Sequence, residues 1–209
     1  MLGTNTNRSR LLDQAREEII TMLEKAHEVY EIAWATLTED GSGDRIDDLD
    51  QDINSGERMV RRLVIEHLTL NPQQDLPSSL TLVSIVHDVE RLGDYAKSIA
   101  ELATWGTSSL SNEGLGAKCR EVQAEIEPLF TLAIEGIRDD DESKASDLMT
   151  RHKAIKAKTD TITQESLQTD HHPEVRAVLA SRYLRRVSAH LSNIVSSITN
   201  PFDLISRDE

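Results

Sequence analysis

The sequence predicts an all-α fold of six helices, arranged as two tandem three-helix bundles packed side by side. Aromatic residues make up only 3% of the 209 residues whereas charged residues reach 29%, a balance typical of amphipathic helices. Apolar residues recur every three or four positions, as one face of a helix requires. Breaks that contain glycine, proline or a run of aspartates divide the pattern into six segments, and the last three segments repeat the plan of the first three.

Three helices are predicted within residues 1–105. The first has an apolar series that stays on one face for some seven turns: Leu12, Ala15, Ile19, Met22, Ala26, Val29, Ala33 and Leu37. The second is expected from about residue 45, where Asp44 can cap its first amides, to about residue 70. Asn71-Pro72 ends it, and Pro77 starts a third helix that runs to about Ala103.

Three more helices are predicted within residues 106–209. A stretch rich in Gly, Ser and Thr, residues 106–116, separates the halves. The fourth helix is expected between Leu115 and Ile137. The fifth starts after the cap Asp139-Asp140-Asp141, and the sixth runs from Pro173 to Asn200-Pro201. Each repeat alone has a small core, so the halves are expected to pack into one elongated bundle.

Composition excludes several classes of function. The formal net charge of -14 disfavours nucleic acids and anionic membranes as partners and favours cations or basic protein surfaces. No run of 18 apolar residues could span a bilayer and no signal segment is seen, so a soluble cytoplasmic protein is expected. The lone Cys119 follows the apolar stripe of its helix, which predicts a buried thiol. The sequence has no phosphate-binding loop and no partnered nucleophile, so an enzyme is not expected.

An acidic stripe on the third predicted helix is the strongest functional clue. Its apolar positions share one face: Ile85, Val89, Leu92, Ala96, Ile99 and Ala103. Its polar positions lie on the other: His87, Glu90, Asp94 and Glu101. Glu90 and Asp94 are one turn apart, so their carboxylates can converge on a cation. The same stripe can equally be an ordinary solvated face, with His87 as a surface histidine.

The acidic stripe also resembles a family signature. Residues 90–101, Glu-Arg-Leu-Gly-Asp-Tyr-Ala-Lys-Ser-Ile-Ala-Glu, are similar to the E-R-I-G-D-H-A-x-N-I-A-E motif of the PhoU family of phosphate-signalling proteins. A degenerate second copy of the motif follows 95 residues later, with Arg185 in place of Glu90 and Ala189 in place of Asp94. The resemblance extends to the six-helix, two-repeat plan and implies a divergent member whose second motif has degenerated.

The resemblance implies a metal site on the first repeat. The family gathers metal ions through acidic E/D-x-x-x-D motifs, and Glu90 and Asp94 match one of them. At the start of the second helix the family usually adds acids of the pattern D-x-x-I-D. This chain keeps Asp47 but has Gly43 at the leading place, so Asp47 ranks below the pair on the third helix. Asp44 or Asp48 could substitute. The ions implied are iron, zinc, manganese or magnesium.

The second repeat carries positive charge where the motif would be. Basic residues gather on the fifth and sixth predicted helices: Lys153, Lys156, Lys158, Arg182, Arg185 and Arg186. A guanidinium repels a metal ion, so no second metal site is expected. The cluster either binds an anion or an acidic partner, or pairs with acids such as Asp160 and Glu165. His171-His172-Pro173 is expected to form a loop and not a metal site.

By resemblance, the chain is expected to be a cytoplasmic regulator of phosphate uptake and of the phosphate-starvation response. Its implied partners are a phosphate transporter subunit or a sodium/phosphate symporter, and a sensor histidine kinase. No nucleic acid or membrane insertion is expected, and a homodimer is open. Two alternatives remain: a metal-free helical adaptor of a phosphate symporter, and a metal-dependent phosphohydrolase that holds two cations on the acidic stripe. The phosphohydrolase is the less favoured of the two.

Overall fold

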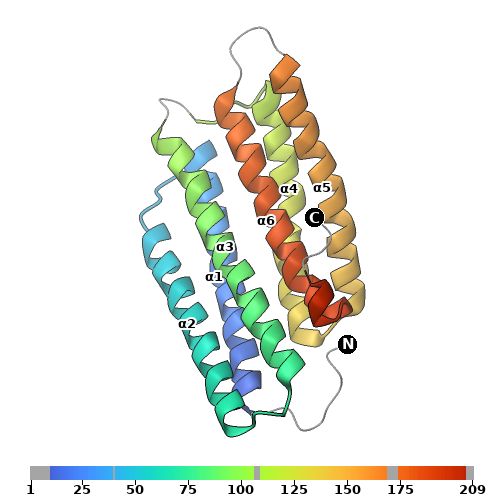
Figure 1. Cartoon of the computed structure of the whole chain (residues 1–209). Helices are drawn as coiled ribbons and strands as arrows, with labels where there is room; N and C mark the ends of the chain where they lie inside the picture. The colour runs from blue at the N-terminus through green and yellow to red at the C-terminus, as the bar shows by residue number, and fades with distance from the viewer. Residues whose placement is uncertain (1–9, 40, 106–108, 169–173, 206–209) are drawn as a thin grey trace.

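The computed structural model describes residues 10–39, 41–105, 109–168 and 174–205, and its all-α fold of six long helices confirms the predicted fold class. The elements are α1 (Arg10–Thr38), α2 (Ile46–Leu70), α3 (Leu76–Thr104), α4 (Gly114–Asp139), α5 (Glu142–Gln168), α6 (Val175–Thr199) and a short 3₁₀ helix, η1 (Phe202–Leu204). The six long helices run side by side as an elongated bundle (Figure 1). Across the described residues, no helix combines the length and the apolarity needed to cross a membrane.

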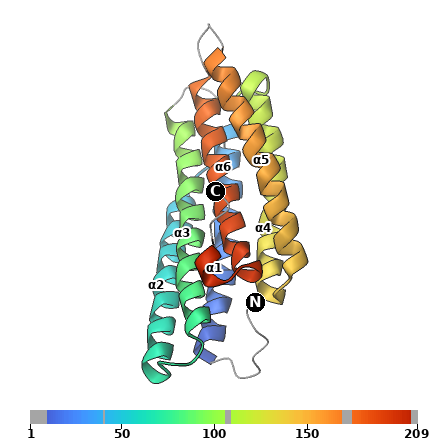
Figure 2. The same ribbon diagram turned by 45° about the vertical axis from the view of Figure 1, so that its right-hand side comes forward.

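The helices form two groups of three. α1, α2 and α3 contact one another, as do α4, α5 and α6. The groups meet through α3 against α6 and through α1 against α4. α2 and α5 lie at opposite edges of the bundle in both views (Figures 1 and 2). The proposed division between residues 105 and 106 stays a prediction, because residues 106–108 lie outside the described ranges, as does the predicted loop at 171–173.

Local signals place most helix ends correctly. Pro77 lies in the first turn of α3. The Asp141 carboxylate accepts hydrogen bonds from the backbone N–H groups of Ser143 and Lys144 at 2.9 and 3.1 Å, so it caps α5 as expected. The expected Asp44 cap of α2 is wrong. Arg45 occupies the cap position and gives no side-chain cap. The backbone N–H of Ile46 donates instead to the backbone carbonyl of Gly43 at 3.0 Å.

The core is aliphatic and runs through both groups. All eight residues of the apolar series predicted for the first helix are buried. α1 also buries Ile20, Leu23, Tyr30 and Trp34, because it contacts α4 as well as α2 and α3. The ring centroids of Tyr30 and Phe130 are 5.1 Å apart across that contact. Cys119 is buried as expected, and burial raises its pKa to about 12, which keeps the thiol protonated at neutral pH.

A polar network crosses the contact between α3 and α6. Asp88 is 9% exposed, and one of its carboxylate oxygens accepts hydrogen bonds from His190 Nδ1 at 2.7 Å and Asn193 Nδ2 at 3.1 Å. The His190 ring stacks on Tyr95 of α3 with centroids 5.5 Å apart. A nearly buried carboxylate therefore helps to hold the two groups of helices together.

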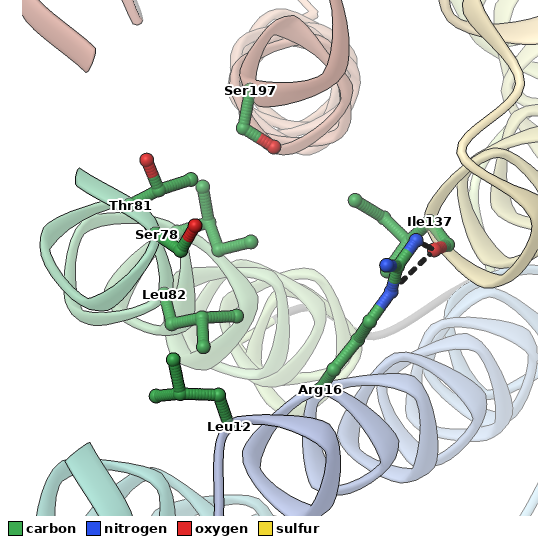
Figure 3. A pocket seen from close by; sticks show the side chains of 8 residues that line it. Leu12, Arg16, Ser78, Thr81, Leu82, Ile137 and Ser197 are labelled. Carbon is green, nitrogen blue, oxygen red and sulfur yellow. Dashed lines mark hydrogen bonds between the residues drawn. The ribbon is translucent and has the colours of Figure 1, made fainter. Parts of the chain in front are cut away.

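A second polar link joins α1 to the end of α4. The Arg16 guanidinium donates two hydrogen bonds to the backbone carbonyl of Ile137, one of them from Nε at 2.8 Å (Figure 3). It also pairs with Asp140 at 3.0 Å. A cation at the C-terminus of a helix also interacts favourably with the helix dipole. The cavity beside Arg16 is largely apolar and has a volume of only about 20 Å³, so it can hold little more than a water molecule.

Candidate functional site

The predicted metal ligands lie where α2 packs against α3. Five carboxylates on these two helices, here named the acidic face, belong to Asp47, Asp50, Glu57, Glu90 and Asp94. Gly93 is buried in this contact, and a Cβ atom there would lie 3.2 Å from Ile53 Cδ1. The glycine of the signature motif therefore lets the two helices approach closely, which brings their acids together.

Lys97 is the counter-charge at one end of the acidic face. Its ammonium nitrogen lies 3.1 Å from Asp47 Oδ1 and 3.5 Å from Asp50 Oδ2. The hydrogen bond to Asp47 and the charge of Asp50 raise the pKa of Lys97, so this residue keeps its positive charge at neutral pH. Asp47 is thus already paired within the chain, and a metal ion could use it only if Lys97 moved away.

Glu90 lies near the other end and is the least exposed of the predicted ligands. Its side chain is 18% exposed, and its Oε2 atom is buried without a hydrogen-bond partner. His87 Nδ1 and Arg91 Nε lie 3.6 and 3.8 Å from this oxygen, beyond hydrogen-bond distance. Burial raises the pKa of Glu90, and the neighbouring charges of Asp94 and Glu57 add to the effect. An oxygen in this state gains free energy from a bound cation.

The three predicted ligands are not gathered into one ready-made site. Asp94 lies next to Glu90 but is partly exposed and pairs with Arg91 at 2.9 Å. Asp47 is held by Lys97 instead. The unpartnered oxygen of Glu90 suits a cation, whereas Arg91 and Lys97 compete with one. Metal binding at Glu90, Asp94 and Asp47 therefore stays a prediction.

A group of potential ligands that the sequence did not point to lies between α1 and α4. Among the described residues, His27, Glu31 and Glu127 are the three whose ligand atoms all come within 4.8 Å of one another. His27 Nε2 lies 2.6 Å from Glu127 Oε1, and the His27 ring stacks on Phe130 at 4.7 Å. The hydrogen bond to Glu127 raises the pKa of His27 against the opposing effect of burial. These contacts account for the cluster as a link between the two helices.

A basic pocket lies between α5 and α6 in the second group of helices. The cavity has a volume of about 160 Å³ and is lined by His152, Lys156, Arg182, Arg185, Arg186 and Ala189. Arg185 and Ala189 follow Glu90 and Asp94 by 95 residues, so the pocket occupies the sequence position that the acidic motif has in the first group. Arg185 pairs with Asp160, as one of the two open interpretations expected. Glu165 pairs with Lys118, a residue outside the predicted cluster.

The fold and the first half of the chain are similar to known proteins. The PhoU domain model matches residues 12–103, which span α1 to α3. The crystal structure of PhoU from Pseudomonas aeruginosa has a TM-score of 0.79 and 20% identity, over 90% of this chain and 95% of that one. The crystal structure of the phosphate transport system regulatory protein PhoU from Streptococcus pneumoniae has a TM-score of 0.78 and 16% identity, over 95% of this chain and 96% of that one.

None of the curated protein sequences matches the chain. At 20% and 16% identity, the two crystal structures establish the fold. The match to the PhoU domain covers the three helices of the first group, two of which carry the acidic face. The chain therefore has the PhoU fold, and its residues 12–103 are similar to the PhoU domain.

Proposed function

We propose that the chain is a cytoplasmic regulator of phosphate uptake and of phosphate-starvation signalling, and that it acts by binding other proteins. The observation that carries the proposal is a PhoU domain within a chain whose fold matches the Streptococcus pneumoniae regulatory protein over nearly its full length. The proposed partners are a phosphate transporter subunit or symporter and a sensor histidine kinase.

The surface of the first group of helices supports binding to another protein. Among the described residues, six of the eleven large apolar side chains that are exposed lie between residues 59 and 83, at the end of α2 and the start of α3: Met59, Ile65, Leu70, Leu76, Leu80 and Val83. Exposed apolar side chains that gather in one region are a common feature of interaction surfaces. Long, rigid helices also offer the extended faces that a stable interface requires.

We further propose that the acidic face binds divalent cations, through Glu90 and Asp94 at one end and through Asp47 at the other, where the ion would displace Lys97. The buried, unpartnered Oε2 atom of Glu90 and the raised pKa of this residue support a cation at this position. Carboxylate ligands alone favour magnesium or manganese, whereas participation of His87 would favour zinc or iron.

The regulator proposal is tested in cells of the source organism that lack the chain. Uptake of radiolabelled phosphate and the activity of a phosphate-starvation promoter are measured in phosphate-rich medium. Both should rise when the chain is removed and return when it is restored. Affinity capture of the tagged chain from the same cells should recover transporter or kinase subunits. Unchanged uptake and unchanged promoter activity would refute the proposal.

The metal proposal is tested on protein purified without chelator. Elemental analysis should find a bound transition metal or magnesium, and titration with that metal should raise the melting temperature. Glu90→Gln should abolish the rise, whereas the control Glu101→Gln, an exposed acid of the same helix outside the acidic face, should not. Absence of metal and of any rise would leave the metal-free adaptor. Turnover of phosphate esters with added manganese, zinc or iron would support the phosphohydrolase instead.

A further inference from the structure

We propose that the basic pocket between α5 and α6 binds a small phosphate-class oxyanion, either inorganic phosphate or the phosphoryl group of a small soluble molecule. The inference comes from the charge, volume and placement of the pocket and does not require the regulator proposal to be correct.

The pocket concentrates positive charge in an acidic chain. The net charge of the protein is -14, yet four of the six lining residues are cations: Lys156, Arg182, Arg185 and Arg186. The carboxylate of Asp160 pairs with Arg185. In the described parts of the chain, neither Lys156 nor Arg182 forms an ion pair. Like charges held around one cavity repel each other, and a bound anion relieves this repulsion.

Residues of α5 and α6 line two sides of the pocket. Arg182, Arg185 and Ala189 recur at three and four residues on α6, so they share one side of that helix. His152 and Lys156 are one turn apart on α5, which packs against α6. The His152 ring is anchored by a hydrogen bond between its Nδ1 atom and Ser188 Oγ at 3.0 Å. Ala189 contributes only a methyl group where the first repeat has Asp94, so no carboxylate enters the cavity from that position.

The donors suit a tetrahedral oxyanion. Each guanidinium presents a planar fork that can bind two oxygens of one phosphate group, and a lysine adds a point charge. A phosphoryl group with about 1.5 to 2 negative charges has enough acceptor oxygens for several such donors. The volume of about 160 Å³ is below the range of about 300–1,000 Å³ of pockets for drug-sized ligands, so it fits a single phosphate group better than a nucleotide.

Binding is tested by isothermal titration of the intact chain with inorganic phosphate and, separately, with pyrophosphate, in chloride buffer of matched ionic strength. Saturable binding at one site per chain and a higher melting temperature are expected. Lys156→Gln and Arg182→Gln should each weaken binding by about tenfold or more, since each removes a charge-assisted hydrogen bond. The control is Lys153→Gln, which makes the same charge change. Lys153 precedes Lys156 by three residues on α5 and does not line the pocket. The control variant should change affinity less than about twofold.

The outcomes separate the possible sources of the anion. Failure to bind either soluble anion overturns the proposal. An equal loss of anion affinity in Lys153→Gln and Lys156→Gln also overturns it. Binding to vesicles that contain phosphatidylglycerol without binding to soluble phosphate also contradicts it. Circular dichroism of each variant checks that the helices are intact. Phosphate uptake that stays regulated in Lys156→Gln would leave the regulator proposal standing even if anion binding is lost, so the two proposals can fail separately.

Discussion

The Asp88 carboxylate should be one of the most important polar groups for the stability of this fold. Replacing it by alanine removes the acceptor of two hydrogen bonds that link α3 to His190 and Asn193 of α6. Hydrogen bonds to a charged group are worth about 1.5–3 kcal/mol each, and removal of one partner of a buried charged pair costs about 3–5 kcal/mol. Because the Asp88 and His190 side chains are 12% and 16% exposed, the lower end applies, and we expect a loss of about 3 kcal/mol.

Urea unfolding followed by circular dichroism measures this loss as a lower midpoint at an unchanged slope. Asp94→Ala is the matched control, because it removes the same residue type from the same helix. Its partly exposed pair with Arg91 should contribute no more than about 0.5 kcal/mol. Asp88→Asn keeps one acceptor oxygen and should recover part of the loss. If Asp88→Ala costs under about 1 kcal/mol, or no more than Asp94→Ala, the carboxylate does not hold the two groups of helices together.

Two further predictions concern the contact between α1 and α4. Arg16→Gln should lower the free energy of unfolding by about 2 kcal/mol, because the Ile137 carbonyl loses its charged donor. Arg138→Gln, which removes an exposed pair with Glu24 between the same helices, should cost at most about 0.5 kcal/mol, and equal losses in urea unfolding would contradict this ranking. His27 has a raised folded-state pKa, so its stabilisation is complete below the unfolded value of 6.5 and is lost as the pH rises through the folded pKa. The difference in melting temperature between wild type and His27→Gln should therefore shrink from pH 5.5 to 8.5, and a constant difference would refute the link.

Helices were predictable from the sequence because their determinants are local. Apolar spacing, the proline at the start of α3 and the Asp141 cap of α5 act within one or two helical turns. The Asp44 cap failed for an equally local reason. The turn before α2 lets the first amide of the helix bond to the Gly43 carbonyl, so the side-chain acceptor is not needed.

The polar links between helices were not predictable because they depend on register and rotation. His27 and Glu127 are 100 positions apart and Asp88 and His190 are 102 apart, so no short pattern relates them. The basic cluster was visible as a set of residues. Which lysine of α5 enters the cavity depends on how that helix is rotated against α6, and the structure places Lys156 there while Lys158 pairs with Glu125.

The two groups of helices carry clusters of opposite charge at corresponding positions of one scaffold. Four apolar positions of the signature helix are buried in α3 and again 95 residues later in α6: Val89, Leu92, Ala96 and Ile99 correspond to Leu184, Val187, Leu191 and Ile194. Packing constrains these positions, because a change of size or polarity in the core is costly. Glu90 and Asp94 lie outside that set, so their replacement by Arg185 and Ala189 reverses the local charge without disturbing the core. The PhoU fold therefore extends over nearly the whole chain, whereas the match to the PhoU domain ends at residue 103.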